Sequence, residues 1–213
     1  MPARLRPTAP VAADALLVGD PGRALMLAQE LLEQPKMSNH ARGLWGYSGV
    51  TAAGRELTIQ STGMGGPSAS VVLEDLAELG VRQAIRIGTC ASLGDLALGG
   101  LMIVTEAHTP AGTGSLPDPL LTSALAEAVD GAVSGVVVSL ESLYRPEAEI
   151  PSMVAEGADM QSAGLLRAAA RLGVAAAAVL VATERNDSGQ LRDERLEATA
   201  KRVGKAALAV LST

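Results

Sequence analysis

Residues 85–89 place an arginine near the end of a segment that is otherwise typical of a protein core. Two isoleucines flank Arg86, and a glycine and Thr89 follow. This alternation predicts a buried strand that brings one cation and one hydroxyl group to its carboxyl end. An arginine among core residues is costly unless an anion meets it. The segment therefore predicts an anion-binding position at this strand end.

Two glycine-rich turns predict binding of the same anion. Residues 19–23, Gly-Asp-Pro-Gly-Arg, follow the apolar run 15–18 and precede a helical pattern. Residues 61–68, Ser-Thr-Gly-Met-Gly-Gly-Pro-Ser, follow the strand pattern 57–61 and also precede a helical pattern. Bare backbone N–H groups at such strand-to-helix turns, together with the helix N-terminus, favour phosphate.

These three segments, in this order, resemble the nucleoside phosphorylase-I family, which includes uridine phosphorylases and hexameric bacterial purine nucleoside phosphorylases. The resemblance is strong from about residue 15 to 106 and weaker from 135 to the C-terminus. It implies a pentosyltransferase that cleaves an N-riboside with inorganic phosphate, giving the free base and ribose 1-phosphate. It also implies phosphate as cosubstrate and no metal or organic cofactor.

The resemblance assigns the phosphate to Arg23, Arg86, Thr89 and the backbone at Gly19, with Arg86 also acting in catalysis. Arg42 lies in a segment that resembles the family's stretch that lends an arginine to a neighbouring subunit. Arginine suits this task because its planar fork binds phosphate oxygens bidentately. Taken singly, Arg23 and Arg42 would be ordinary surface arginines, but the motifs around them favour phosphate binding.

The segment 156–163 takes the place of the family's Glu-Met-Glu run, which holds the ribose. Met160 is retained, Asp159 is the first acid, and Gln161 replaces the second glutamate. Glutamine brings no charge, so its grip on sugar hydroxyls should be weaker. Two alternatives stay open from the residues alone: Met160 fills the core, and Asp159 caps the following helix.

The base-binding half of the site departs furthest from the family pattern. Glu184 and Arg185 stand where family members contact the base, and Tyr144 could stack on base or sugar. Glu184 could be a general acid if burial raises its pKa, or an exposed carboxylate paired with Arg185. The family's N-terminal histidine is missing, since the only histidines are His40 and His108. These departures fit a changed substrate or a catalytically impaired nucleoside-binding paralogue.

A nucleosidase that uses water is the other alternative, and the convergent arginines count against it.

The composition excludes several classes of binding partner and site. The net charge of −6 and pI near 5.0 argue against nucleic acid or an anionic membrane as the main partner. Cys90 is the only cysteine in the sequence, which excludes an intramolecular disulfide and a cysteine metal cluster. We expect a cytoplasmic protein, because the sequence has no membrane-spanning run or signal core. The resemblance of the Arg42 segment implies a homodimer, or a hexamer built from dimers.

Alternating short apolar runs and longer helical patterns must position these residues. They predict an α/β fold: one domain over residues 1–213, with a mixed β-sheet flanked by helices on both faces in three layers. Residues 1–13 should form a flexible arm, and 107–118 a loop. Ligands in such sheets lie at the carboxyl ends of strands, where every motif above falls. Strands are predicted over 15–18, 46–50, 57–61, 84–88, 101–105, 135–140, 155–158 and 175–182, and helices over 23–33, 67–79, 119–129, 160–172 and 190–211.

Overall fold

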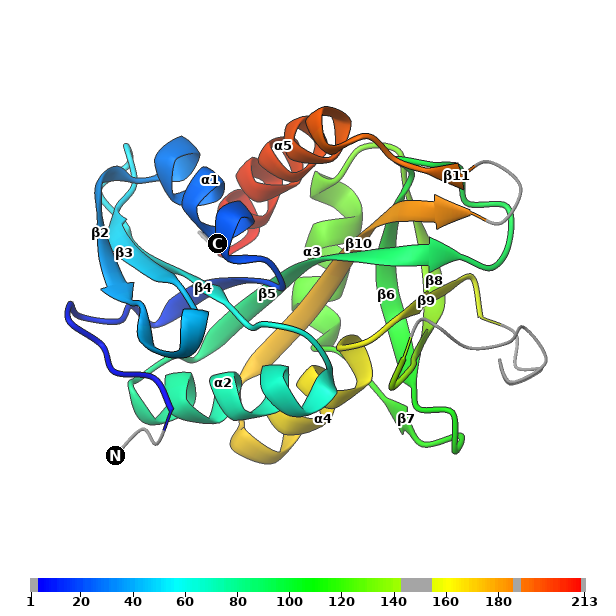
Figure 1. The fold of residues 1–213 in the computed structure, drawn as a ribbon, viewed down its shortest axis with the longest axis horizontal. Helices are drawn as coiled ribbons and strands as arrows, with labels where there is room; N and C mark the ends of the chain where they lie inside the picture. The colour runs from blue at the N-terminus through cyan, green and yellow to red at the C-terminus, as the bar shows by residue number, and fades with distance from the viewer. Residues whose placement is uncertain (1–3, 143–154, 186–188, 212–213) are drawn as a thin grey trace.

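The computed structural model describes residues 4–142, 155–185 and 189–211 and has the predicted α/β architecture (Figure 1). One large mixed sheet lies between two layers of helices. The strands of the described residues are β1 (Asp14–Val18), β2 (Glu33–Asn39), β3 (Gly46–Val50), β4 (Glu56–Ser61), β5 (Gln83–Ser92), β6 (Leu101–His108), β7 (Gly114–Ser115), β8 (Ala132–Ser139), β9 (Gly157–Asp159), β10 (Ala175–Arg185) and β11 (Gly189–Gln190).

Strand β5 joins two differently shaped halves of the sheet. On one side it pairs in parallel with β1, and β4, β3 and β2 continue outward as an open wing. Its other edge pairs in parallel with β10, whereas β9 pairs with Ala91 and Ser92 on the edge shared with β1, past the end of β1. Because β10 and β9 are linked through β6 and β8, these five strands close into a ring. Because β1, β4, β5 and β10 run parallel to one another, their carboxyl ends share one edge of the sheet.

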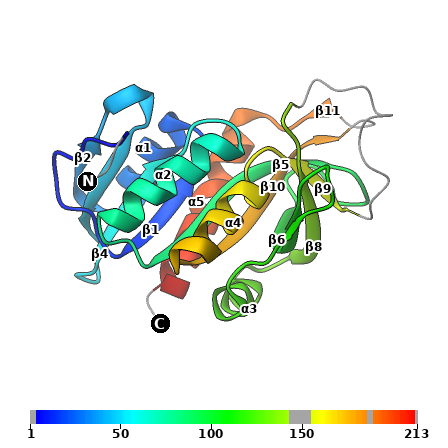
Figure 2. The same ribbon diagram turned by 90° about the horizontal axis from the view of Figure 1, so that it is seen from below.

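The helices cover the two faces in the pattern that the strand alternation requires (Figure 2). In β1, Leu17 faces one core cluster, with α2 and α4, whereas Leu16 and Val18 face another, with α1, α3 and α5. Successive strand residues point to opposite faces, so the apolar residues 15–18 of β1 are buried on both. The helices are α1 (Pro21–Leu31), α2 (Gly66–Glu78), α3 (Pro119–Ala128), α4 (Ser162–Leu172) and α5 (Asp193–Leu211), with a short 3₁₀ helix η1 (Ala41–Gly43).

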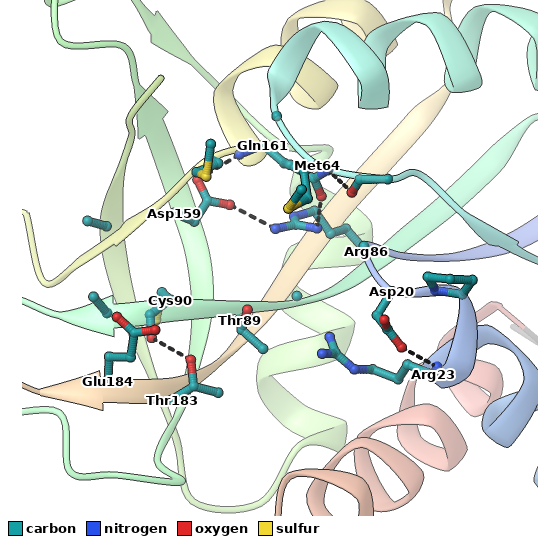
Figure 3. Close-up of a pocket in the computed structure, with 18 residues that line it drawn as sticks. Asp20, Arg23, Met64, Arg86, Thr89, Cys90, Asp159, Gln161, Thr183 and Glu184 are labelled. Atoms are coloured by element: carbon teal, nitrogen blue, oxygen red, sulfur yellow. Dashed lines mark hydrogen bonds and ion pairs between the residues drawn. The ribbon is translucent and has the colours of Figure 1, made fainter. Parts of the chain in front are cut away.

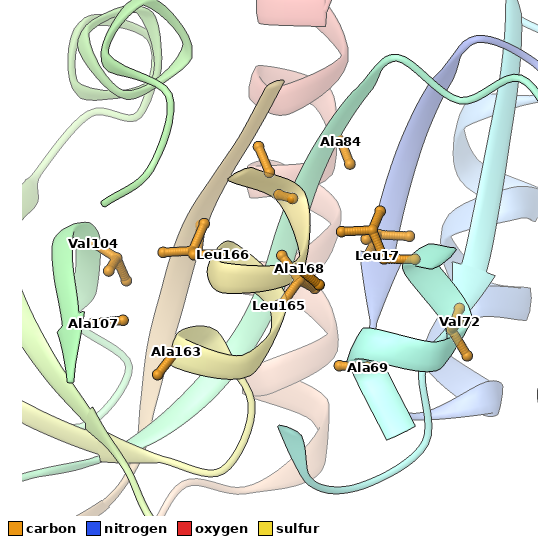
Figure 4. Packing of buried hydrophobic residues seen from close by; sticks show 14 of the residues in the cluster. Leu17, Ala69, Val72, Ala84, Val104, Ala107, Ala163, Leu165, Leu166 and Ala168 are labelled. Atoms are coloured by element: carbon orange, nitrogen blue, oxygen red, sulfur yellow. The ribbon is translucent and has the colours of Figure 1, made fainter. Parts of the chain in front are cut away.

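Small residues let α2 and α4 lie close together over the first core cluster (Figure 4). The sequence has no phenylalanine, and alanines such as Ala69 and Ala163 are buried in this cluster. The helices lie close at their N-termini, where a Cβ atom on Gly164 would lie 2.8 Å from the Cα of Gly66. A larger side chain at either position would separate the two helices next to the strand ends.

Each predicted strand and helix is present, and the differences lie at ends and edges. Strand β5 continues to Ser92, because β10 and β9 pair with its extension. Strand β2 was not predicted, since it is polar, mostly exposed and contains Pro35, as an edge strand can. The predicted loop 107–118 is partly strand, because β6 continues to His108 and β7 folds back onto it. Helix α5 begins at Asp193 rather than 190, because β11 pairs with β10 first.

The described part of the N-terminal arm is docked on the wing of the sheet. The buried carboxylate of Asp75 accepts hydrogen bonds from the backbone N–H groups of Arg4 and Leu5, each at 2.6 Å. Leu5 is buried, and Thr8 bonds to the backbone carbonyl of Ser38 at 2.7 Å. None of the helices in the described residues is both long and apolar enough to cross a membrane.

Candidate functional site

A cavity of about 490 Å³ opens at the shared edge where β1, β4, β5 and β10 end (Figure 3). Segments that are far apart in the sequence meet here, as expected for a ligand site of an α/β sheet. The cavity is lined by Gly19, Asp20, Pro21, Arg23, Gly63, Met64, Gly65, Arg86, Gly88, Thr89, Cys90, Ala91, Ala158, Asp159, Met160, Gln161, Thr183 and Glu184.

The turn between β1 and α1 presents Arg23 to the cavity. Asp20 caps α1 by accepting a hydrogen bond from the backbone N–H of Arg23 at 2.7 Å, and Pro21 occupies the first turn. The Arg23 guanidinium has no hydrogen-bond or ion-pair partner among the described residues. Burial lowers the pKa of Arg23, Asp20 opposes this shift, and Arg86 lowers the pKa further. Arginine stays protonated despite such shifts, so the turn offers an available cation.

Arg86 lies in the same cavity but is held by the junction between β9 and α4. Its side chain is only 4% exposed. Its Nε donates to Ser162 Oγ at 3.3 Å, Nη1 to Gln161 Oε1 at 2.6 Å, and Nη2 to Asp159 Oδ2 at 2.9 Å. A guanidinium has five N–H groups, so one on each terminal nitrogen is left for a ligand.

Gly88 makes room for the Arg86 head group. A Cβ atom at this position would lie 2.6 Å from the guanidinium carbon of Arg86 and 2.7 Å from a methyl carbon of Leu180. Real Cβ atoms do not approach so closely, so the strand needs glycine where the arginine folds back across it. The Arg-Ile-Gly-Thr sequence at 86–89 thus specifies a buried, pre-oriented cation.

Asp159 bonds to the backbone N–H groups at the start of α4 and is the counter-ion of Arg86. One oxygen accepts from the Ser139 hydroxyl at 2.5 Å and the backbone N–H of Gln161 at 3.1 Å. The other accepts from the Ser162 hydroxyl at 2.7 Å and from Arg86. The backbone N–H of Ser162 also donates to this carboxylate, at 3.0 Å. Asp159 thus bonds to the start of α4 and also pairs with Arg86, and its role as a sugar ligand stays a prediction.

Gln161 bridges the β9 segment to the glycine-rich loop after β4. Its Oε1 accepts from Arg86 and lies 3.3 Å from the Thr62 hydroxyl, while its Nε2 donates to the carbonyl of Gly63 at 2.6 Å. The side chain is 4% exposed. The side-chain oxygen and nitrogen of Gln161 are therefore both hydrogen-bonded to the protein, and they connect two walls of the cavity.

The loop after β4 brings bare backbone to the cavity. Gly63 and Gly65 have φ angles of 70° and 82°, in the left-handed region that glycine adopts most readily. Gly65 precedes α2 without any side-chain cap. Between the two glycines, Met64 is 86% exposed at the rim of the cavity. The loop can thus offer N–H groups of a helix N-terminus on one side and an apolar thioether on the other.

At the opposite end of the cavity, the β10–β5 ladder is broken by a bulge at Thr183, between Ala182 and Glu184. Bulges commonly re-aim side chains next to sites, and here Glu184 lines the cavity beside Cys90. Glu184 is half-buried and has no hydrogen-bond or ion-pair partner among the described residues. Burial raises the pKa of the Cys90 thiol to about 12; Asp159 also raises it and Arg86 lowers it. Cys90 is therefore a neutral thiol at physiological pH.

The structure brings together eight of the residues predicted for the site: Gly19, Arg23, Arg86, Thr89, Asp159, Met160, Gln161 and Glu184. Arg42 and Arg185 do not line the cavity. Arg42 is exposed on η1 with a φ of 61°, and Arg185 ends β10 opposite Gly189. Tyr144 lies outside the described residues.

Sequence reasoning did not assign a role to several residues that shape the site. Ser139 and Ser162 complete the hydrogen bonding of Asp159, and Thr62 contacts Gln161. Met64 and Thr183 also line the cavity. Thr62 and Met64 lie inside the glycine-rich motif, and Ser162 lies inside the segment 156–163, so these three had a visible signal. Ser139 could not be found, since it meets Asp159, 20 residues away, only after folding.

Comparisons with known proteins match most of the chain. The family model for the phosphorylase superfamily matches residues 14–213. A purine nucleoside phosphorylase of the DeoD type from Caldanaerobacter subterraneus subsp. tengcongensis is 31% identical over 200 residues, covering 84% of this chain and 86% of the relative. One of the same type from Clostridium perfringens is 32% identical over 194 residues, covering 82% of each chain.

Proposed function

Because the chain belongs to the nucleoside phosphorylase-I family of the phosphorylase superfamily, we propose that it cleaves the N-glycosidic bond of a nucleoside with inorganic phosphate. The products are the free base and a pentose 1-phosphate. The observation that supports this most strongly is the convergence of Arg23 and Arg86 on one cavity between two glycine-rich turns. A phosphate dianion matches two cations and bare N–H groups, whereas attack by water needs neither.

The proposed reaction breaks the bond between C1′ and the base nitrogen and forms a bond between C1′ and a phosphate oxygen. The bonding electrons leave with the base, which gains a proton. Arg86 is oriented before substrate arrives, so it can hold phosphate in line with C1′ without reorganising. Arg23 and the Thr89 hydroxyl complete the phosphate contacts in this proposal.

Glu184 is the residue that we assign to the departing base. It lines the end of the cavity away from Arg23, beside Thr183 and Cys90 (Figure 3). A carboxyl group there could donate a proton or a hydrogen bond to the leaving nitrogen. A purine base agrees with what the named relatives act on.

A screen across purine and pyrimidine nucleosides tests the proposed function. Base release should require phosphate and should produce a pentose 1-phosphate. Equal release in phosphate-free buffer would instead identify a nucleosidase. Phosphate binding without cleavage of any nucleoside would favour the catalytically impaired paralogue.

We also propose that a second copy of the chain completes the phosphate site with its Arg42. In its own chain Arg42 is exposed and lies outside the cavity. A two-fold symmetric dimer lets each copy lend the same residue to the other. Light scattering should therefore detect a dimer or a multiple of it, and Arg42→Ala should weaken phosphate binding without changing that state. A monomer at micromolar concentration would contradict the shared site.

A further inference from the structure

We propose that the preferred substrate of this cavity is a 2′-deoxynucleoside rather than a ribonucleoside. The inference rests on the proposed phosphorolysis and names the sugar that it acts on. It follows from the side-chain acceptors of Asp159 and Gln161 next to Arg86, which already accept hydrogen bonds from the protein.

The position of the sugar follows from the position of the phosphate. If phosphate binds to Arg23 and Arg86, then C1′ must lie beside that phosphate to be attacked. C2′ is bonded to C1′, so its substituent lies close to the residues that surround the Arg86 head group. The cavity-lining residues there are Asp159, Met160 and Gln161.

A 2′-hydroxyl group in this place would need an acceptor for its proton. The Asp159 carboxylate is 3% exposed and already accepts from Arg86, from Ser139 and from both the backbone and the hydroxyl of Ser162. Gln161 is 4% exposed, its Oε1 accepts from Arg86, and the Thr62 hydroxyl lies against that oxygen. Both side chains therefore already accept at least two hydrogen bonds from the protein.

The other surfaces close to this position suit a methylene group. The side chains of Met64 and Met160 line the cavity, and thioethers pack well against irregular apolar shapes. The cavity's carboxylate without a partner among the described residues, Glu184, lies at the β10 end rather than beside Arg86 (Figure 3). A buried hydroxyl without an acceptor is penalised, whereas the CH₂ of a 2′-deoxy sugar is not.

The direct test compares kcat/KM for inosine with 2′-deoxyinosine, and for uridine with 2′-deoxyuridine, in saturating phosphate. We expect the deoxy substrate to be preferred by about tenfold or more in whichever pair is cleaved. Equal values, or a preference for the riboside, would overturn the inference while leaving phosphorolysis intact.

Calorimetry with ribose 1-phosphate and 2-deoxyribose 1-phosphate tests the same point without catalysis. Tighter binding of the deoxy sugar phosphate supports the inference, and equal binding overturns it. If neither compound binds and no nucleoside is cleaved, the proposed function fails and the inference fails with it.

Gln161→Glu should shift the preference toward ribosides. The carboxylate would face the Gly63 carbonyl, to which Nε2 now donates at 2.6 Å, so repulsion should turn one oxygen toward the cavity. We expect the deoxy-to-ribo ratio to fall by about fivefold or more. Gln29→Glu adds the same charge at an exposed position on α1 and should leave the ratio unchanged. A folded Gln161→Glu enzyme, verified by its melting temperature, with an unchanged ratio would contradict the role of Gln161.

Discussion

The two arginines of the cavity lie in regions that differ in how many hydrogen bonds they make to the guanidinium. Arg86, on the ring side of β5, has three nitrogens bonded to the β9–α4 junction and a buried counter-ion in Asp159. Arg23, on the wing side, sits in a short turn, and its guanidinium has no hydrogen-bond or ion-pair partner among the described residues. On the ring side, the hydrogen bonds fix the orientation of Arg86, but Asp159 neutralises its charge. The wing side supplies a cation whose charge is not cancelled by direct pairing.

This difference separates stability from binding. A buried arginine with a fixed partner is part of the folded core, and removing it leaves an uncompensated charge. An arginine that meets no protein partner adds little to folding and is available to a ligand. Loss of Arg86 should therefore lower the stability of the fold, whereas loss of Arg23 should weaken phosphate binding.

The largest effect is expected for Arg86→Ala. This change leaves the 3%-exposed carboxylate of Asp159 without its cation, so the free energy of unfolding should fall by about 3–5 kcal/mol. Urea denaturation at pH 7 measures it. Adding Asp159→Asn to the same chain should restore part of the loss, because the unpaired charge disappears. A loss below about 1 kcal/mol would mean that the network does not stabilise the fold.

A smaller effect, on binding alone, is expected for Arg23→Ala. Losing a charge-assisted contact of about 1.5–3 kcal/mol should weaken phosphate binding by about 10- to 150-fold. The free energy of unfolding should change little, since no protein partner is lost. Calorimetric titration with inorganic phosphate measures the binding, and Arg167→Ala, exposed on α4, is the matched control. Destabilisation of Arg23→Ala equal to that of Arg86→Ala would remove the contrast between the two sides.

The smallest effect concerns Cys90, because the pKa of its thiol depends on burial and on the charges of Asp159 and Arg86. Its folded-state pKa of about 12 exceeds the unfolded value of about 8.5, so the folded protein retains the proton longer. Stability from this group is thus fully present below about pH 8.5 and is lost as the pH rises toward 12. Relative to Cys90→Ala, the wild-type protein should lose about 1–2 kcal/mol between pH 8 and pH 10.

Denaturation of both proteins at pH 8, 9 and 10 measures this loss. Asp159→Asn should reduce it, because the negative charge that helps to raise the thiol pKa is gone. Parallel pH dependence in wild type and Cys90→Ala would show that the thiol ionises equally in both states.

The strand and helix pattern could be predicted because it depends on local periodicity. Each predicted strand and helix is present, and β3 has the predicted bounds. The short or polar pairings β2, β7 and β11 were missed, since each forms only where another strand offers its edge. The closing of the sheet into a ring was likewise not visible, because β9 has only three residues and joins β8 to β5.

What the sequence by itself determined is the set of residue types at strand ends: the glycines that admit turns, and the arginines that need an anion. Those follow from local chemistry and ordering along the chain. Only the tertiary structure decided which polar groups satisfy each other. Asp159 and Arg86 are 73 residues apart in sequence and meet because β9 folds back antiparallel onto β5. Hydrogen-bond partnership is a property of three-dimensional distance, so Gln161 could be recognised as an unusual residue from the sequence, but not as one already bound to the protein.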